Sequence, residues 1–96
     1  MKESQFQSQV IKYLKERGAY VLNVAGGTQI PKGTPDLLVC WRGRFIALEL
    51  KVGKNTTSEL QDYHIDCISE SGGVAMVIRP ENWESFKMEL EDMTSV

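Results

Sequence analysis

The chain has 96 residues, of which 42% are hydrophobic and 25% are charged, and its formal net charge is −2 at pH 7. These values are typical of one small globular domain and argue against a strongly basic nucleic-acid coat protein, but not against an enzyme that acts on DNA. No apolar run approaches the roughly 18–20 residues of a membrane span, and no signal peptide is apparent. We therefore expect a cytoplasmic protein whose Cys40 and Cys67 are reduced thiols in the core.

The first third of the chain predicts a helix, a strand and a long loop. Residues 3–17 carry apolar side chains at helical spacing, and Gly18 follows them as a helix stop. Residues 19–25 are rich in strand formers. Residues 26–35 contain three glycines and two prolines, which predicts a loop.

Two apolar segments, 36–41 and 44–52, flank the short Arg42-Gly43 sequence and predict a β-hairpin. Thr56 and Glu59 have the spacing of a capping box, which predicts a helix that runs to about Ser71.

After Gly72-Gly73, residues 74–79 predict a fourth strand, and a last helix is expected over about 82–92. The expected order is αβββαβα, an α/β fold with helices packed on a mixed sheet.

Three charged side chains converge at the open end of the expected hairpin. If Arg42-Gly43 is a two-residue turn, Asp36 lies directly opposite Glu49, and opposed side chains point to the same face of the sheet. Lys51 lies two residues beyond Glu49 and shares that face. A bulged turn is the alternative, because arginine is a poor residue for positive φ, and a slip of one residue would send Glu49 to the other face.

Two neighbouring carboxylates repel each other unless a cation lies between them. Lys51 is one candidate, and it would form a simple ion-pair cluster with Asp36 and Glu49. A divalent cation is the other, because Mg²⁺ binds through one or two carboxylates together with phosphate and water oxygens. The charge pattern alone leaves both interpretations open.

A set of short motifs resembles the VRR-type nuclease domain (VRR-NUC) of the PD-(D/E)XK nuclease superfamily. These motifs are Gly33-Thr34-Pro35-Asp36-Leu37-Leu38, Arg42-Gly43-Arg44-Phe45, Glu49-Leu50-Lys51 and Gln61. The resemblance extends from Glu3 to about Pro80. It implies a restriction-endonuclease-like αβββαβ core, here with an extra C-terminal helix, and a single nuclease domain over residues 1–96.

The resemblance also implies roles for individual residues. Asp36 and Glu49 would be the metal-binding carboxylates, with the carbonyl of Leu50 as a further ligand of Mg²⁺ or Mn²⁺. Lys51 would stabilise charge on the scissile phosphate or orient the attacking water. Gln61 would lie near the active site, unless it is an ordinary solvent-facing side chain.

Glu3 has two interpretations. It continues the core-facing stripe of the first helix, and superfamily members often supply an acidic residue to the metal site from this helix. A glutamate in the first turn is also favourable for helix electrostatics alone.

The remaining polar and aromatic residues carry weaker signals. Lys32 and Lys54 lie in loops next to the ends of the catalytic strands and are the expected DNA phosphate contacts. Arg42 and Arg44 could also contact phosphates, but they lie at the far end of the hairpin and are less well placed, so the alternative is that they are only solvated turn residues. His64 has no second nitrogen or sulfur ligand, so zinc is not expected. Tyr63 is expected to be in the core.

We therefore expect a metal-dependent, structure-selective endodeoxyribonuclease, with a homodimeric Holliday junction resolvase as the favoured form. Its partner would be branched DNA such as a four-way junction, and two copies would supply the wider surface that one small subunit lacks. A flap, nicking or restriction-like nuclease is one alternative. A non-catalytic DNA-binding module on the same fold is the other.

Overall fold

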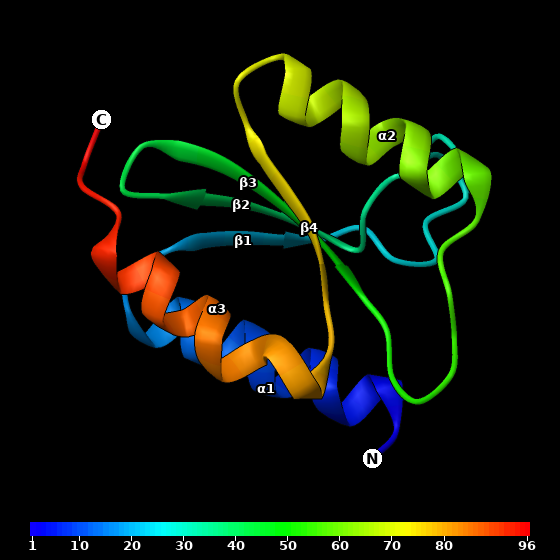
Figure 1. Cartoon of the computed structure of the whole chain (residues 1–96), viewed down its shortest axis with the longest axis horizontal. Helices are drawn as coiled ribbons and strands as arrows, with labels where there is room; N and C mark the ends of the chain where they lie inside the picture. The colour runs from blue at the N-terminus through cyan, green and yellow to red at the C-terminus, as the bar shows by residue number, and fades with distance from the viewer.

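The computed structural model describes residues 1–96 and contains a four-stranded sheet between helices (Figure 1). In chain order the elements are α1 (Glu3–Glu16), β1 (Tyr20–Asn23), β2 (Leu37–Trp41), β3 (Arg44–Leu50), α2 (Glu59–Glu70), β4 (Val74–Ile78) and α3 (Pro80–Asp92). The strand order is β1-β2-β3-β4; β1, β2 and β3 pair antiparallel, and β4 pairs parallel to β3. The predicted element order and mixed sheet are confirmed.

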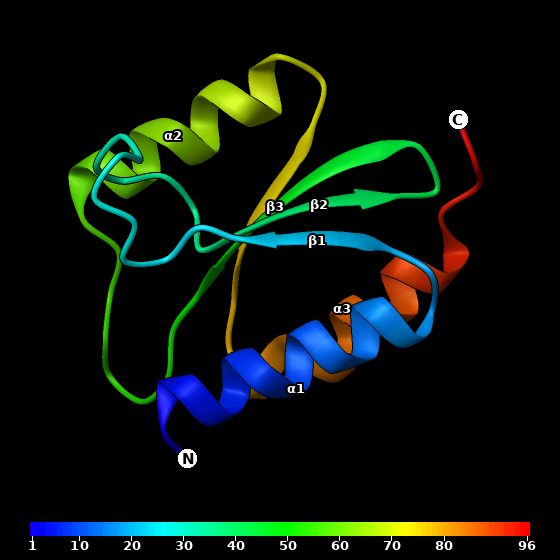
Figure 2. The ribbon, with the colours of Figure 1, turned by 180° about the vertical axis from the view of Figure 1, so that it is seen from behind.

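The helices form a layer on each side of the sheet. Figures 1 and 2 show α1 and α3 together on one face and α2 on the other. Helix α2 makes the crossover between β3 and β4, which parallel neighbours require. None of the three helices is long and apolar enough to cross a membrane.

The core lies between the sheet and the α1/α3 layer. Alternate residues of β2 and β3 point to this side, and each helix presents side chains three or four positions apart to meet them. One end of the core is closed by Trp41, whose indole N–H donates to the carbonyl of Leu90 at 2.9 Å. The buried cluster comprises Phe6, Val10, Leu14, Leu37, Val39, Trp41, Ile46, Leu48, Leu50, Ile78, Trp83, Phe86 and Leu90.

The hairpin between β2 and β3 has the predicted register and no bulge. Trp41 pairs with Arg44, and the intervening Arg42 and Gly43 have φ of 52° and 81°, as in a type I′ turn. Arginine is an unusual residue at positive φ. Here the guanidinium of Arg42 donates to the carbonyls of Glu91 at 2.9 Å and Met93 at 2.6 Å. It therefore anchors the end of α3, and its interpretation as a merely solvated turn residue is wrong.

The starts of two helices differ from the sequence prediction. The N-cap of α2 is Ser58, whose Oγ accepts from the Gln61 N–H, so the Thr56–Glu59 capping box is wrong. Both pairs satisfy the spacing rule, and the helix begins after the later one. Helix α3 begins at Pro80 because proline is well suited to a first helical turn, where its missing N–H would have no partner.

The α2 layer covers only part of its face of the sheet. Helix α2 packs on β4 and β3, and none of its side chains is fully buried. Tyr63 and Cys40 are exposed, so their predicted core positions are wrong, while Cys67 is half-buried. On the uncovered part, Tyr20 is 67% exposed and Phe45 is 49% exposed.

Candidate metal and phosphodiester site

The open end of the β2–β3 hairpin brings Asp36 and Glu49 together. The paired residues end at Leu37 and Leu48, and one further step of the same register sets Asp36 opposite Glu49. The backbone of Asp36 is held beside the end of β1, since its carbonyl accepts from the N–H of Val24, the residue after this strand, at 2.9 Å. The Asp36 side chain crosses to β3, where Oδ2 accepts from the backbone N–H of Leu50 at 2.9 Å.

Glu49 is the one buried charged residue of the chain, with 2% of its surface exposed. Its Oε2 accepts from Nε2 of Gln61 at 3.1 Å and lies 3.4 Å from Nζ of Lys51. Its Oε1 is buried and has no hydrogen-bond partner. A buried carboxylate oxygen without a partner is costly for a folded protein, which marks this atom as a functional candidate.

The surroundings of Glu49 raise its pKa from the ordinary value of 4.5 to about 7. Burial is the largest cause, because it disfavours the charged form, and the negative charge of Asp36 is the next. Lys51 acts in the opposite direction and lowers the pKa through its charge and hydrogen bond. The Lys51 ion pair therefore only partly compensates the carboxylate pair.

The donor set at this site fits a divalent cation of the Mg²⁺ type. The free Oε1 of Glu49 and the neighbouring Asp36 carboxylate are hard oxygen ligands, and Leu50 offers its backbone carbonyl on the same strand end. No group of three or more His, Cys, Asp or Glu residues is close enough to hold a metal ion by itself. A cation here would need water or phosphate oxygens to complete its coordination, which is usual for Mg²⁺.

Glu3 lies in the first turn of α1 and is exposed. Its charge is close enough to Glu49 to raise the pKa of Glu49, as the smallest of the five causes. It is not part of a three-carboxylate cluster, so its assignment as a direct metal ligand stays a prediction. Gln7, one turn further on, instead donates to Oδ1 of Asn23 at 3.2 Å.

The loop before Asp36 is held against α2 by a close contact at Gly33. Gly33 has φ of +87°, and a Cβ at this position would lie 2.7 Å from Cγ of Leu60. Leu60 directly precedes Gln61, so this contact joins the loop that carries Asp36 to the helix that carries Gln61. Only glycine combines the positive φ with this approach.

Lys32 and Lys54 are exposed and lie in the two loops that border the site. Figure 1 shows these loops, coloured cyan and green, on the same side of the molecule. The second loop is held by Arg79, whose guanidinium donates to the carbonyls of Gly53 at 3.2 Å and Asn55 at 2.6 Å.

Sequence reasoning missed two residues that support the site, Arg79 and Ser58. Arg79 carries no motif signal, because it donates to backbone carbonyls of a distant segment. Ser58 could have been found by testing every Ser/Thr-x-x-Glu/Gln pair, since Ser58 and Gln61 also fit that pattern.

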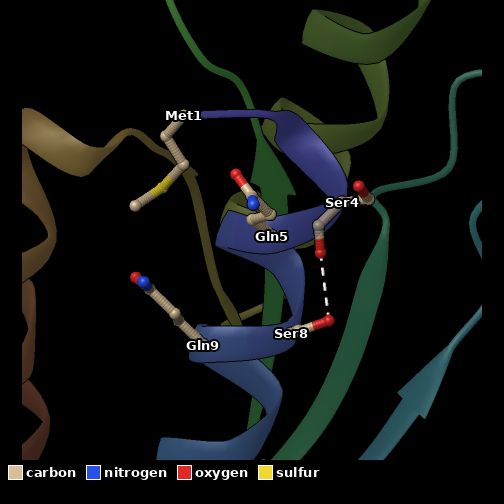
Figure 3. Close-up of a pocket in the computed structure, with 5 residues that line it drawn as sticks. All are labelled: Met1, Ser4, Gln5, Ser8 and Gln9. Carbon is tan, nitrogen blue, oxygen red and sulfur yellow. Dashed lines mark hydrogen bonds between the residues drawn. The ribbon is translucent and has the colours of Figure 1, made fainter.

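The largest surface hollow lies elsewhere. It has a volume of about 610 Å³ and is lined by Met1 and by side chains on the outer face of α1 (Figure 3). The helix residues that line it are Ser4, Gln5, Ser8 and Gln9. None of them is charged or contacts the carboxylate pair, and Ser8 bonds only to the Ser4 carbonyl of its own helix. The hollow is an ordinary polar helix surface.

Comparison with known proteins supports the fold. No family model and no curated protein matches the chain. Among solved structures, the chain is similar to Hjc of Archaeoglobus fulgidus, a Holliday junction resolvase from an archaeal hyperthermophile. The TM-score is 0.55 at 20% sequence identity, over 79% of this chain and 67% of that one. The chain has the restriction-endonuclease-like fold. The site described above lies on the hairpin strands and the crossover helix of this fold.

Proposed function

We propose that the chain is a divalent-metal-dependent endodeoxyribonuclease of the VRR type, and that it cleaves branched DNA as a homodimer. The observation that carries the proposal is the buried Glu49, held beside Asp36 with one carboxylate oxygen free of partners. A purely structural ion pair has no need for a free buried oxygen. The similarity to a Holliday junction resolvase supports the choice of branched DNA.

Asp36, Glu49 and the Leu50 carbonyl would hold the cation, as expected for Mg²⁺ or Mn²⁺. When bound, the cation polarises a phosphodiester oxygen and lowers the pKa of a water molecule. The Lys51 ammonium, 3.4 Å from Oε2 of Glu49, adds positive charge where a phosphate would bring negative charge. Gln61 restrains the Glu49 carboxylate through its 3.1 Å hydrogen bond.

Lys32 and Lys54 are the proposed phosphate contacts on either side of the site. Both are exposed, and neither forms an ion pair with an acidic side chain. A free lysine in a loop binds a DNA phosphate without reading the base sequence. This arrangement supports selection of DNA by its shape.

A second copy of this chain is the proposed occupant of the uncovered sheet surface, defined by Tyr20, Leu22, Leu38, Cys40 and Phe45. None of these side chains carries a charge at neutral pH, so two copies related by a two-fold axis meet there without repulsion between like charges. The surface also has no basic side chain that would attract the phosphates of DNA.

The test is cleavage of a labelled four-way junction and a matched linear duplex in Mg²⁺, Mn²⁺ or EDTA. The wild type is compared with Glu49→Gln and with Glu89→Gln, a control that removes an exposed glutamate of α3. We expect paired symmetric cuts in the junction that disappear with EDTA and with Glu49→Gln but persist with Glu89→Gln. Metal-dependent cutting of linear or nicked DNA alone would keep the nuclease and exclude the resolvase. Metal-independent binding without cleavage of any substrate would favour the non-catalytic module.

The homodimer has its own test in Phe45→Glu, which adds a charge to the uncovered surface. Light scattering should show a dimer for the wild type and a monomer for this variant, and the paired cuts should become independent nicks. Met88→Glu is the matched control, because Met88 is an exposed apolar residue on α3. A dimer that survives Phe45→Glu would exclude this surface as the interface.

A further inference from the structure

The first turn of α2 contains a reciprocal pair of hydrogen bonds between Ser58 and Gln61. Oγ of Ser58 accepts from the backbone N–H of Gln61 at 3.2 Å. In return, Oε1 of Gln61 accepts from the backbone N–H of Ser58 at 2.9 Å. This capping box satisfies two of the N–H groups that a helix start leaves free.

The capping box also determines which way round the Gln61 amide lies. A backbone N–H can only donate, so the amide atom facing Ser58 must be the oxygen. The amide nitrogen then points away from the cap, where Nε2 donates to Oε2 of Glu49 at 3.1 Å. With the amide reversed, its NH₂ group would face the Ser58 N–H, and two donors would oppose each other.

The orientation of Gln61 in turn decides which oxygen of Glu49 is free. Oε2 is occupied by Gln61 and by Lys51, whereas Oε1 has no partner. Without the Gln61 donor, the Glu49 carboxylate loses one of the two groups that hold Oε2. The cap of α2 is therefore connected to the free Oε1 through two successive hydrogen bonds.

The glutamine half of this device occurs in α1 without this connection, since the N-cap residue Lys2 makes no side-chain cap hydrogen bond. Oε1 of Gln5 accepts from the backbone N–H of Lys2 at 3.1 Å, as Gln61 does from Ser58. The Gln5 amide otherwise faces the solvent-exposed hollow of Figure 3 and contacts no carboxylate of the site. The chain thus provides an internal control for a glutamine cap that serves only its helix.

We propose that Ser58 is a positioning residue for the metal site, which acts through Gln61 to hold Glu49 with Oε1 free of protein hydrogen bonds, so that this oxygen can bind a divalent cation. This inference rests on the proposed function, since it requires that Glu49 binds a metal ion. Ser58 itself touches neither metal nor DNA. Its effect is on the affinity of the protein for the cation before any DNA is present.

The test is an isothermal calorimetric titration of the metal-free protein with Mn²⁺ alone, which measures the affinity of the protein for the cation. Ser58→Ala removes the Oγ acceptor but keeps the backbone N–H. Ser58→Pro also removes the N–H, and the φ of −83° at this position is compatible with proline. Because partners behind metal ligands typically contribute ten- to hundredfold in affinity, we expect a loss of roughly threefold to tenfold for Ser58→Ala and about tenfold or more for Ser58→Pro. Ser58→Thr retains the hydroxyl and should bind within about twofold of the wild type.

A double-mutant cycle separates positioning from general loss of stability. If Ser58 acts through Gln61, Ser58→Ala should lower Mn²⁺ affinity in the wild type and have little further effect in Gln61→Ala. Gln5→Ala removes from α1 the hydrogen bond that Gln61 makes in α2, so it should lower the melting temperature without changing Mn²⁺ affinity. Equal losses from Gln5→Ala and Ser58→Ala, or additive losses in the cycle, would overturn the proposal.

The outcomes also distinguish this inference from the proposed function. If wild type binds Mn²⁺ and Glu49→Gln does not, the metal site stands, and unchanged affinity in both Ser58→Ala and Ser58→Pro would refute only the role of Ser58. If wild type binds no Mn²⁺, both the metal site and the positioning role are refuted. Should Ser58→Pro fail to fold, Ser58→Ala and Ser58→Thr still decide the question.

Discussion

The carboxylate of Asp36 accepts a hydrogen bond from the backbone N–H of Leu50, with 2.9 Å between Oδ2 and the nitrogen. The bond links the residue just before β2 to the end of β3 that carries Glu49. Asp36 is therefore oriented by the main chain of the neighbouring strand. The donor is a backbone N–H and not Lys51, so this bond holds the Asp36 carboxylate, whose charge raises the pKa of Glu49, independently of the lysine.

Replacement of Asp36 should separate its charge from its hydrogen bond. Asp36→Asn keeps an oxygen for the Leu50 N–H but removes the charge that raises the pKa of Glu49, so this pKa should fall below about 7. Carbon-detected NMR titration of the metal-free protein measures it. Asp36→Ala also leaves the Leu50 N–H without its partner and should cost a further 1–2 kcal/mol, roughly, in urea unfolding. A Glu49 pKa that is unchanged in Asp36→Asn would contradict the assigned geometry.

The raised pKa of Glu49 predicts how the stability of the metal-free protein depends on pH. The ordinary value is 4.5 and the folded value is about 7, so between these values the folded state binds more protons than the unfolded state. Raising the pH through this window therefore lowers the free energy of unfolding, and above pH 7 the loss is complete. Asp36 and Glu3 add to this loss, and Lys51 reduces it.

Glu49→Gln cannot ionise and should escape this loss. We expect it to match the wild type at pH 5 and to be more stable at pH 8 by roughly 1–3 kcal/mol, measured by urea unfolding in EDTA. The control Glu89→Gln removes an exposed carboxylate and should follow the wild type at both pH values. If the free energies of unfolding of the wild type and Glu49→Gln changed in parallel with pH, Glu49 would ionise normally.

Gly33→Ala should disturb the site from a distance. The new Cβ would meet Cγ of Leu60 at 2.7 Å and its carbonyl oxygen at 2.8 Å, in a backbone conformation with φ of +87°. The backbone oxygen cannot move independently of α2, so the loop must shift, with a loss of about 2 kcal/mol or more. The rate of DNA cleavage should also fall, because this loop carries Asp36. Gly26→Ala, in the same loop, has φ of +74° and nothing within 4 Å, so it should show the smaller cost of strain alone.

Arg42 should matter for stability and not for cleavage chemistry. Its Nη1 donates to the carbonyls of Glu91 and Met93, and Nη2 lies 3.4 Å from the Glu91 carboxylate. Arg42→Lys keeps the charge but cannot reproduce the fork of donors, so we expect a loss of roughly 1–2 kcal/mol in thermal unfolding. Arg44→Lys is the control, because Arg44 bonds only to Thr94. Equal melting temperatures for the two variants would contradict the anchoring role.

Lys32 and Lys54 should contribute to DNA affinity through phosphate charge alone. Lys32→Ala and Lys54→Ala should each weaken binding to junctions of any sequence and reduce the salt slope of log K by about 1. Fluorescence anisotropy at several salt concentrations, in Ca²⁺ or EDTA, measures both effects. Lys12→Ala, an exposed lysine of α1, should leave the slope unchanged. An unchanged slope for Lys32→Ala and Lys54→Ala would remove these lysines from the DNA surface.

Local patterns determined the elements, the hairpin register and the meeting of Asp36 with Glu49. The alternation of β2 and β3 and the two-residue turn are short-range features, and together they assign each side chain to a face. Helical spacing likewise identified the buried stripe of α1. The sequence was less informative where two nearby residues, Thr56 and Ser58, both have the spacing of a capping box and only one of them caps the helix.

Only the tertiary structure decided how these elements cover one another. Burial of Glu49, the free Oε1 and the raised pKa depend on α2 lying over β3 and β4. The same limited cover leaves Tyr63 and Cys40 exposed, although their local sequence is that of a core. Burial is a property of what packs against a residue from elsewhere in the chain. The identity of a charged pair can therefore be inferred from local sequence, whereas its desolvation is decided by the fold.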